Sequence, residues 1–220
     1  MKAHTAELFE PAPTLQPRRE AVCEGAVVLR GFALAHESGI LRTLDEVLCA
    51  APLRHMLTPG GLRMSVAMSN CGTLGWISDR RGYRYSPDDP ESGKPWPEMP
   101  CAFSQLAHAA AAQAGFENFL PDACLINRYE PRAKLSLHQD RDERDFSRPI
   151  VSVSLGLPAT FLFGGLQRGD KQTRIPLIHG DVAVWGGASR MRHHGVLPLK
   201  AGTHPLLGAC RINLTFRKAA

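Results

Sequence analysis

Eight short runs of β-forming residues follow residue 124, and they constrain the fold of this chain more than any other feature. The runs cover residues 124–130, 134–140, 150–157, 160–164, 173–178, 181–185, 194–199 and 210–217, with turn-forming residues between them. Strands of this length and spacing predict a β-sandwich or a jelly roll. We therefore expect a β-rich core over residues 124–217.

Helices and one long irregular segment are expected upstream of this core. Apolar residues recur at helical spacing within residues 37–51, and an alanine-rich apolar stripe follows Pro100. Residues 26–32 form an apolar run typical of a strand. Residues 70–100 show no apolar period, and connections of this length inside a compact domain are often lids or binding loops. The fold class predicted is thus α+β and mainly β.

Length and charge bound the number of domains and the class of partner. The chain has 220 residues, and its 26 Lys and Arg against 21 Asp and Glu give a net charge of +5. We expect an N-terminal arm over residues 1–20 and a single domain over residues 21–220. The mildly basic balance is compatible with a nucleic-acid partner but is equally common among other enzymes.

Cysteine usage and hydropathy indicate the compartment. The six cysteines form no C-x-x-C pair, and the chain shows neither an apolar leader nor a stretch long enough to cross a membrane. These features predict reduced thiols, no contact with a membrane and residence in the cytoplasm.

Polar side chains share one face in three of the predicted strands. Within residues 211–217, Arg, Asn, Thr and Arg alternate with Ile, Leu and Phe, and within residues 134–140 Lys, Ser, His and Asp point the same way. Asn127 and Tyr129 share a face of a third strand. One such face is ordinarily exposed to solvent, but three together favour a polar pocket inside a barrel.

The motif His138-Gln139-Asp140 carries the candidate chemistry. Two residues apart on a strand, His138 and Asp140 point to the same side. With one distant histidine they would form the two-histidine, one-carboxylate set of non-haem Fe(II) oxygenases. The candidates for the distant ligand are His193 and His194. Only one of them can reach the metal, because neighbouring residues of a strand face opposite sides. Gly195 beside them permits a close approach of backbone near a site.

A second motif of the same form, at residues 179–181, serves as an internal comparison. It precedes the apolar run of residues 182–185, so Gly180 and Asp181 predict a turn that enters a strand and no metal site.

Two arginines on the last strand suggest a carboxylate ligand. Arg211 and Arg217 have equal parity, and two guanidinium forks can hold a dicarboxylate through paired charge-assisted hydrogen bonds. The alternative is a surface ladder of ion pairs, which contributes little stability. Asn127, Tyr129 and Asn213 would add neutral hydrogen bonds around such a ligand.

Taken together, these segments resemble the AlkB family, most closely its bacterial DNA-repairing members. The residues that carry the resemblance are 127–129, 134–140 (KLSLHQD), 152–158 (SVSLGLP), 163–165, 179–187 (HGDVAVWGG), 194–195 and 211–217 (RINLTFR), with 58–61, 64–68, 75–76 and 83–87 upstream. The resemblance covers nearly the whole chain after about residue 20. It implies a double-stranded β-helix, a jelly-roll fold, with supporting helices and a nucleotide-recognition lid over residues 58–100.

The resemblance also implies the cofactors and the residues that bind them. The iron ligands would be His138, Asp140 and His194, and O₂ and 2-oxoglutarate would be the co-substrates. Arg211 would pair with the distal carboxylate of 2-oxoglutarate, and Arg217 would lie near its other carboxylate and near Asp140. The remaining co-substrate contacts would be Asn127, Tyr129 and Asn213.

The reaction implied is removal of an alkyl group from a damaged base such as 1-methyladenine or 3-methylcytosine. Oxidation of 2-oxoglutarate to succinate and CO₂ accompanies hydroxylation of the N-alkyl carbon, which is then lost as an aldehyde. The base must be flipped out or presented in a single strand, so alkylated DNA, preferentially single-stranded, is the expected partner, with RNA as a further possibility. We expect the enzyme to act as a monomer.

Substrate contacts follow from the same resemblance. Trp76 and Tyr83 would be lid aromatics that stack on the base, with the His138 ring opposite, and Asp142 would contact the alkylated edge. The other expected substrate contacts are Thr58, Met68, Lys134, Ser136 and Arg168. Leu62 stands where an aromatic residue is expected, which concerns strand affinity and not the chemistry. Arg80, Arg81 and Arg84 interleave with tyrosines in a pattern suited to a nucleic-acid strand.

Two other functions remain compatible with parts of the sequence. An iron and 2-oxoglutarate enzyme could hydroxylate a small molecule or a protein side chain, but this leaves the aromatic and basic lid and Asp142 unexplained. A non-catalytic metal-binding jelly roll could act as a sensor, but it would not need both Arg211 and Arg217.

Overall fold

The computed structural model describes residues 18–220. Its helices are η1 (Leu34–His36), α1 (Glu37–Ala50), α2 (Cys101–Gln113) and η2 (Gly187–Ser189). Its strands are β1 (Arg18–Cys23), β2 (Ala26–Arg30), β3 (Ala67–Gly72), β4 (Gly75–Asp79), β5 (Gly82–Ser86), β6 (Ala123–Tyr129), β7 (Leu135–His138), β8 (Ile150–Gly156), β9 (Ala159–Phe163), β10 (Thr173–Leu177), β11 (Val182–Trp185), β12 (His194–Val196) and β13 (Arg211–Arg217).

All eight strands predicted after residue 124 are present, as β6 to β13, and both predicted helices form. The largest difference is at the end of β7, which stops at His138 so that Asp140 lies just beyond the strand. The predicted turn at residues 179–181 is also confirmed: Gly180 has φ +85° in a tight turn before β11. The fully buried Asp181 there accepts hydrogen bonds from Arg30 and from the Gly31 amide.

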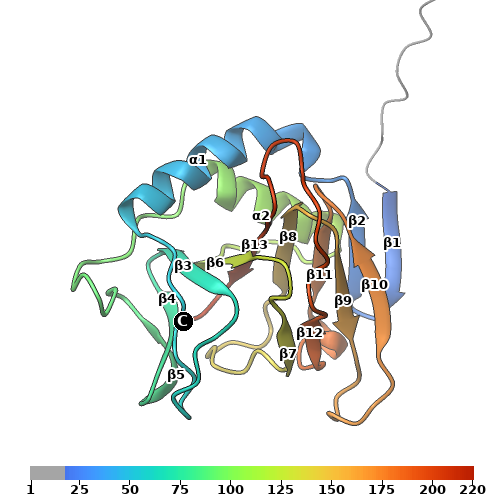
Figure 1. The fold of residues 1–220 in the computed structure, drawn as a ribbon. Helices are drawn as coiled ribbons and strands as arrows, with labels where there is room; N and C mark the ends of the chain where they lie inside the picture. Colours follow the sequence, from blue (N-terminus) through green and yellow to red (C-terminus); the bar gives the residue numbers. More distant parts are fainter. Residues whose placement is uncertain (1–17) are drawn as a thin grey trace, which may run out of the picture.

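Two antiparallel sheets form the jelly roll. The larger has seven strands in the order β1-β2-β11-β8-β13-β6-β3, and the smaller has four in the order β10-β9-β12-β7. Consecutive strands pair in β1–β2 and β9–β10, whereas most other neighbours are far apart in sequence, as when β13 pairs with both β6 and β8. Figure 1 shows the smaller sheet, with β10 in orange, beside the larger one.

Strand alternation divides the interior into two cores. Val27, Leu29 and other residues of one face of the large sheet pack against α1 and α2. Ala26 and Val28 of the opposite face pack against the smaller sheet, where Phe161 and Phe163 contribute rings. The helices therefore cover one side of the large sheet (Figure 1), and the space between the two sheets is left for a pocket. No helix among residues 18–220 is both long and apolar enough to cross a membrane.

Two upstream segments differ from expectation. The segment 70–100 is not irregular throughout: it contains the end of β3 and a hairpin formed by β4 and β5, which lies at the lower left of Figure 1. Its residues are too polar and too rich in proline to show an apolar period, yet their main chains pair. Residues 18–20 belong to β1, whose pairing with β2 extends the sheet into the range expected to be an arm. Residues 1–17 of that arm lie outside the described residues.

Candidate iron and co-substrate site

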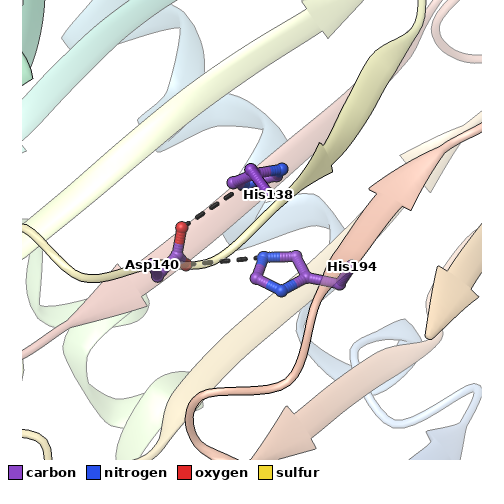
Figure 2. Close-up of side chains that lie close together, drawn as sticks. All are labelled: His138, Asp140 and His194. Atoms are coloured by element: carbon purple, nitrogen blue, oxygen red, sulfur yellow. Dashed lines mark ion pairs between the residues drawn. The ribbon is translucent and has the colours of Figure 1, made fainter. Parts of the chain in front are cut away.

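His138, Asp140 and His194 lie together at one end of the smaller sheet. His138 and His194 are register partners of β7 and β12. The Nε2 atom of His138 is 3.5 Å from Oδ1 of Asp140, and the Nε2 atom of His194 is 3.7 Å from Oδ2 of the same carboxylate (Figure 2). This is the only group of three potential metal ligands within such reach among residues 18–220. The three atoms are placed to bind one ion.

The two imidazoles are oriented by their own main chain. Nδ1 of His138 lies 2.9 Å from the carbonyl oxygen of Ser136, and Nδ1 of His194 lies 3.0 Å from that of Arg192. A carbonyl oxygen only accepts, so each Nδ1 carries the hydrogen and donates it. Nε2 is therefore the ring atom of each histidine that faces Asp140 and is left to ligate an ion, as in other ligating histidines.

Gly195 allows β12 to approach β7 closely. A Cβ atom at this position would meet the carbonyl oxygen of Leu135 at 2.7 Å and the amide nitrogen of Leu137 at 3.2 Å. The sequence predicted a close approach of backbone at this glycine, and the structure confirms it. The structure also chooses between the two candidate histidines. His194 is in the triad, whereas the His193 main chain bonds with Gly164 and Gly165.

Burial and charge set the protonation states of the triad. Burial, aided by the charge of His138, lowers the pKa of His194 to about 3. Burial raises the pKa of Asp140, but Arg217 and the two histidines outweigh it and hold the pKa well below its usual value. Burial lowers the pKa of His138, but the hydrogen-bonded Asp140 outweighs it and leaves the pKa raised. At neutral pH His194 is thus neutral and Asp140 is ionised, as ligation requires.

The polar face of β13 lines a cavity of about 730 Å³ between the sheets. Arg211, Asn213, Thr215 and Arg217 all line it, while the alternate residues of β13 pack in the helix-side core. Nε and Nη2 of Arg217 both donate to Oδ2 of Asp140, at 2.9 and 2.7 Å. The predicted alternation of β13 is therefore confirmed.

Arg211 is an almost fully buried guanidinium that has no counter-ion among residues 18–220. It is 1% exposed, its Nη2 donates to Ser154 Oγ at 2.9 Å, and it packs 5.0 Å over the Tyr129 ring. Its Nε and Nη1 have no hydrogen-bond partner among the described residues, and neither does Oδ1 of Asn127 beside the cavity. Burial accordingly lowers the pKa of Arg211. Unpaired buried donors are costly, so this end of the cavity is suited to a carboxylate ligand.

Some residues of the site were missed by the sequence analysis. Ser152 and Ser154 of β8 accept hydrogen bonds from Asn213 and Arg211. Their alternation with Val151 and Val153 was the available signal, because it places both serines on the pocket face. Glu143 also lies behind the triad, but it belongs to the charged run 141–145, which resembles an exposed loop.

The aromatic lid residues lie at the mouth of the cavity. Trp76 and Tyr83 of the β4–β5 hairpin stack on each other, with ring centroids 5.5 Å apart and an interplanar angle of 15°. Trp76 Nε1 donates to Oδ2 of Asp142 at 2.8 Å. All three residues line the cavity, together with His138.

The remaining predicted substrate residues also line this cavity: Thr58, Met68, Lys134, Ser136 and Arg168. Arg168 is anchored through a hydrogen bond from Nη1 to the Leu137 carbonyl oxygen at 2.8 Å. Leu62 is 74% exposed at the rim. The basic and aromatic pattern of the hairpin is only partly available to a strand, because Arg84 forms two hydrogen bonds with Asp79 and Tyr85 bonds inward to Glu143.

Comparison with known proteins identifies this arrangement. Residues 25–217 match the model of the 2OG-Fe(II) oxygenase superfamily. The chain belongs to this superfamily. It is 58% identical to the alpha-ketoglutarate-dependent dioxygenase AlkB of Escherichia coli (strain K12), over 97% of each chain. It is 45% identical to the AlkB homolog of Caulobacter vibrioides (strain NA1000 / CB15N), over 81% of each.

The fold agrees with this membership of the AlkB dioxygenases. A solved structure of OsALKBH1 superposes with a TM-score of 0.80 at 30% identity, covering 91% of this chain and all of that one. The chain is an Fe(II)- and 2-oxoglutarate-dependent dioxygenase. Its side chains fit both groups: the triad offers two imidazole nitrogens and a carboxylate, and Arg211 offers unpaired donors.

Proposed function

We propose that this dioxygenase repairs N-alkylated bases in DNA by oxidative demethylation, with 1-methyladenine and 3-methylcytosine as representative lesions. The observation that carries the proposal is the mouth of the cavity, where a stacked aromatic pair and the carboxylate of Asp142 line the same space as the triad. N-methylation at these positions makes the base cationic, and such a base suits an aromatic face beside an anionic group. The match to AlkB supports the same conclusion.

In this proposal 2-oxoglutarate occupies the inner end of the cavity. Arg211 pairs with the distal carboxylate through its two unpartnered donors, and Arg217 lies near the other carboxylate while it holds Asp140. Asn127, Tyr129 and Asn213 line the space between them. When iron is bound by the triad, it supplies the activation of O₂ that couples oxidation of 2-oxoglutarate to hydroxylation of the N-alkyl carbon.

The damaged base occupies the outer end. It enters as a flipped or single-stranded nucleotide, because a base inside the helical stack cannot reach the triad. Trp76 and Tyr83 cover one face of the base, the His138 ring covers the other, and Asp142 contacts the alkylated edge. Thr58, Met68 and Ser136 shape the cavity around the base. Lys134 and Arg168, exposed at the rim, contact the phosphates. A single strand presents its bases without the cost of unpairing, so we propose that the enzyme favours single strands, and that it acts as a monomer.

The direct test is release of formaldehyde from a single-stranded oligonucleotide that carries 1-methyladenine, with Fe(II), ascorbate and 2-oxoglutarate present. We expect one formaldehyde and one succinate per repaired base, and no turnover by His138→Ala. Asp142→Asn keeps the hydrogen-bond acceptor for Trp76 but removes the charge, so it should raise KM for the methylated strand most. Succinate without formaldehyde across a panel of methylated bases would contradict the proposal and indicate hydroxylation of a different substrate.

A further inference from the structure

A buried network of charged side chains lies directly behind the iron triad. Its centre is Glu143, whose side chain is 2% exposed. Oε2 of Glu143 accepts a hydrogen bond from Nη2 of Arg190 at 3.0 Å, and Oε1 accepts one from the Tyr85 hydroxyl at 2.7 Å. A third partner is Arg217, whose Nε lies 3.3 Å from Oε1 of Glu143. One carboxylate thus joins three elements that are remote in sequence.

Arg190 connects this network to the main chain of Asp140. Its side chain is 3% exposed, and its planar fork reaches three acceptors. Nη1 donates to the Asp140 carbonyl oxygen at 2.8 Å, Nε to the Arg148 carbonyl oxygen at 3.1 Å, and Nη2 to Glu143. Arg190 lies four residues before His194, so this single side chain joins the segment that carries one ligand to the segment that carries another.

We propose that Arg190 and Glu143 are positioning residues that fix Asp140 between the two histidines and link the lid hairpin to the iron site. Asp140 lies beyond the end of β7, so no strand pairing sets its position. Arg190 holds its main chain, Arg217 holds its carboxylate, and Glu143 bonds to both arginines. Tyr85 extends the same connection to β5, in the hairpin that also carries Trp76.

The arginine at position 190 is needed for its shape as well as its charge. A lysine ammonium is a point donor and does not reproduce a planar fork that bridges two carbonyl oxygens and a carboxylate. Partners of this kind, one step removed from the ligands, typically change metal affinity about 10–100-fold when altered. The proposal rests on the triad being the iron site, and the experiment must separate failure of that assignment from failure of the positioning role.

The test is binding of Mn(II) to the full chain, followed by loss of the free-ion electron paramagnetic resonance signal, in the absence of substrate. Arg190→Lys should raise the Kd for Mn(II) about 10–100-fold. The matched control is Arg30→Lys, because Arg30 also bonds to two carboxylates and one carbonyl oxygen but lies in β2 away from the triad. The control should lower Tm and leave the Kd for Mn(II) unchanged.

Each outcome then decides one point. If wild type binds Mn(II) no better than His138→Ala, the iron site itself is wrongly assigned. If wild type binds and Arg190→Lys binds equally well, or if Arg30→Lys weakens binding as much, the positioning role is overturned. Should Arg190→Lys fail to fold, Glu143→Gln replaces it, since it keeps the side-chain volume while turning an amide toward one of the donors. It is expected to weaken Mn(II) binding as well, and unchanged binding would overturn the role.

The link to the lid has a separate readout. Tyr85→Phe removes only the hydroxyl that bonds to Glu143. We expect unchanged Mn(II) affinity and unchanged KM for 2-oxoglutarate, with a several-fold increase in KM for a methylated oligonucleotide. An unchanged KM for the oligonucleotide would show that the hairpin is held independently of the network.

Discussion

Replacement of Arg211 by methionine separates ligand binding from stability. The wild-type guanidinium is 1% exposed, and two of its donors have no hydrogen-bond partner within the described part of the chain, so without 2-oxoglutarate this buried charge is uncompensated there. Methionine of similar volume removes that charge. Replacement of buried charged groups by apolar residues of similar volume is often neutral or stabilising for the folded state. The loss of the hydrogen bond to Ser154 costs about 1 kcal/mol. We therefore expect the unliganded Arg211→Met variant to unfold within a few degrees of wild type.

Binding of 2-oxoglutarate should respond very differently. Removal of one partner of a buried, hydrogen-bonded charge pair costs about 2–5 kcal/mol, so the Kd for 2-oxoglutarate should rise at least roughly 30-fold. In a thermal unfolding assay with Mn(II) and 2-oxoglutarate at 100 times the wild-type Kd, the ligand stabilises wild type by about 2.7 kcal/mol. For a chain of this length that is a Tm increase of about 5–11 °C, and the variant should gain less than about a third of it.

Arg128→Met is the matched control, since Arg128 lies in the same pair of strands but is exposed. It should keep the full ligand-induced shift. The reasoning would be refuted if Arg211→Met kept that shift, or if the unliganded variant lost several kcal/mol, because Arg211 would then serve the fold and not the ligand.

Three further changes test other parts of the site. Gly195→Ala places a Cβ atom 2.7 Å from the Leu135 carbonyl oxygen of β7, so it should push β12 and its His194 away from β7 and abolish Mn(II) binding. In the control Gly169→Ala the Cβ atom meets nothing within 4 Å, and this variant should bind Mn(II) normally. Equal Mn(II) affinity of the two variants would contradict the close approach of β12 to β7. Burial raises the pKa of Asp89, but its hydrogen bonds with Arg54 outweigh this and lower it, so the unfolded chain takes up the proton first as pH falls. Asp89→Asn should therefore lower the free energy of unfolding by about 1–3 kcal/mol at pH 7. In urea denaturation the difference should begin to shrink as pH falls below about 4, the ordinary pKa of an Asp in the unfolded chain, and should be lost below the lowered pKa of the folded state; a pH-independent difference would exclude the ion pair as its source. Trp76→Ala should raise KM for a methylated oligonucleotide by the equivalent of about 1–3 kcal/mol of stacking, with little change in KM for 2-oxoglutarate, and steady-state kinetics that show the reverse would remove Trp76 from the base site.

Periodicity explains why so much of the fold could be predicted from the sequence. Alternation in β13 directs Arg211 and Arg217 to the cavity and the apolar residues between them to the opposite face. This pattern depends only on neighbouring residues, so it can be predicted from the sequence. The same holds for the turn at Gly180, whose positive φ suits glycine. The β4–β5 hairpin was missed because its polar residues pair through the main chain, which leaves no apolar period to detect.

The sequence by itself therefore determined the eight strands after residue 124, the polar face of the last strand and the candidate ligands. Only the tertiary structure decided that Asp140 is held beyond the end of its strand and that Glu143 is buried within a charged run. It also brought His194, which the family resemblance had indicated, beside His138. These features depend on partners 47 to 77 residues away, such as Arg190 and Arg217. A charged side chain is stable in the interior only where packing brings an opposite charge or hydrogen-bond partners to it, and a contact between residues distant in sequence leaves no local sequence pattern.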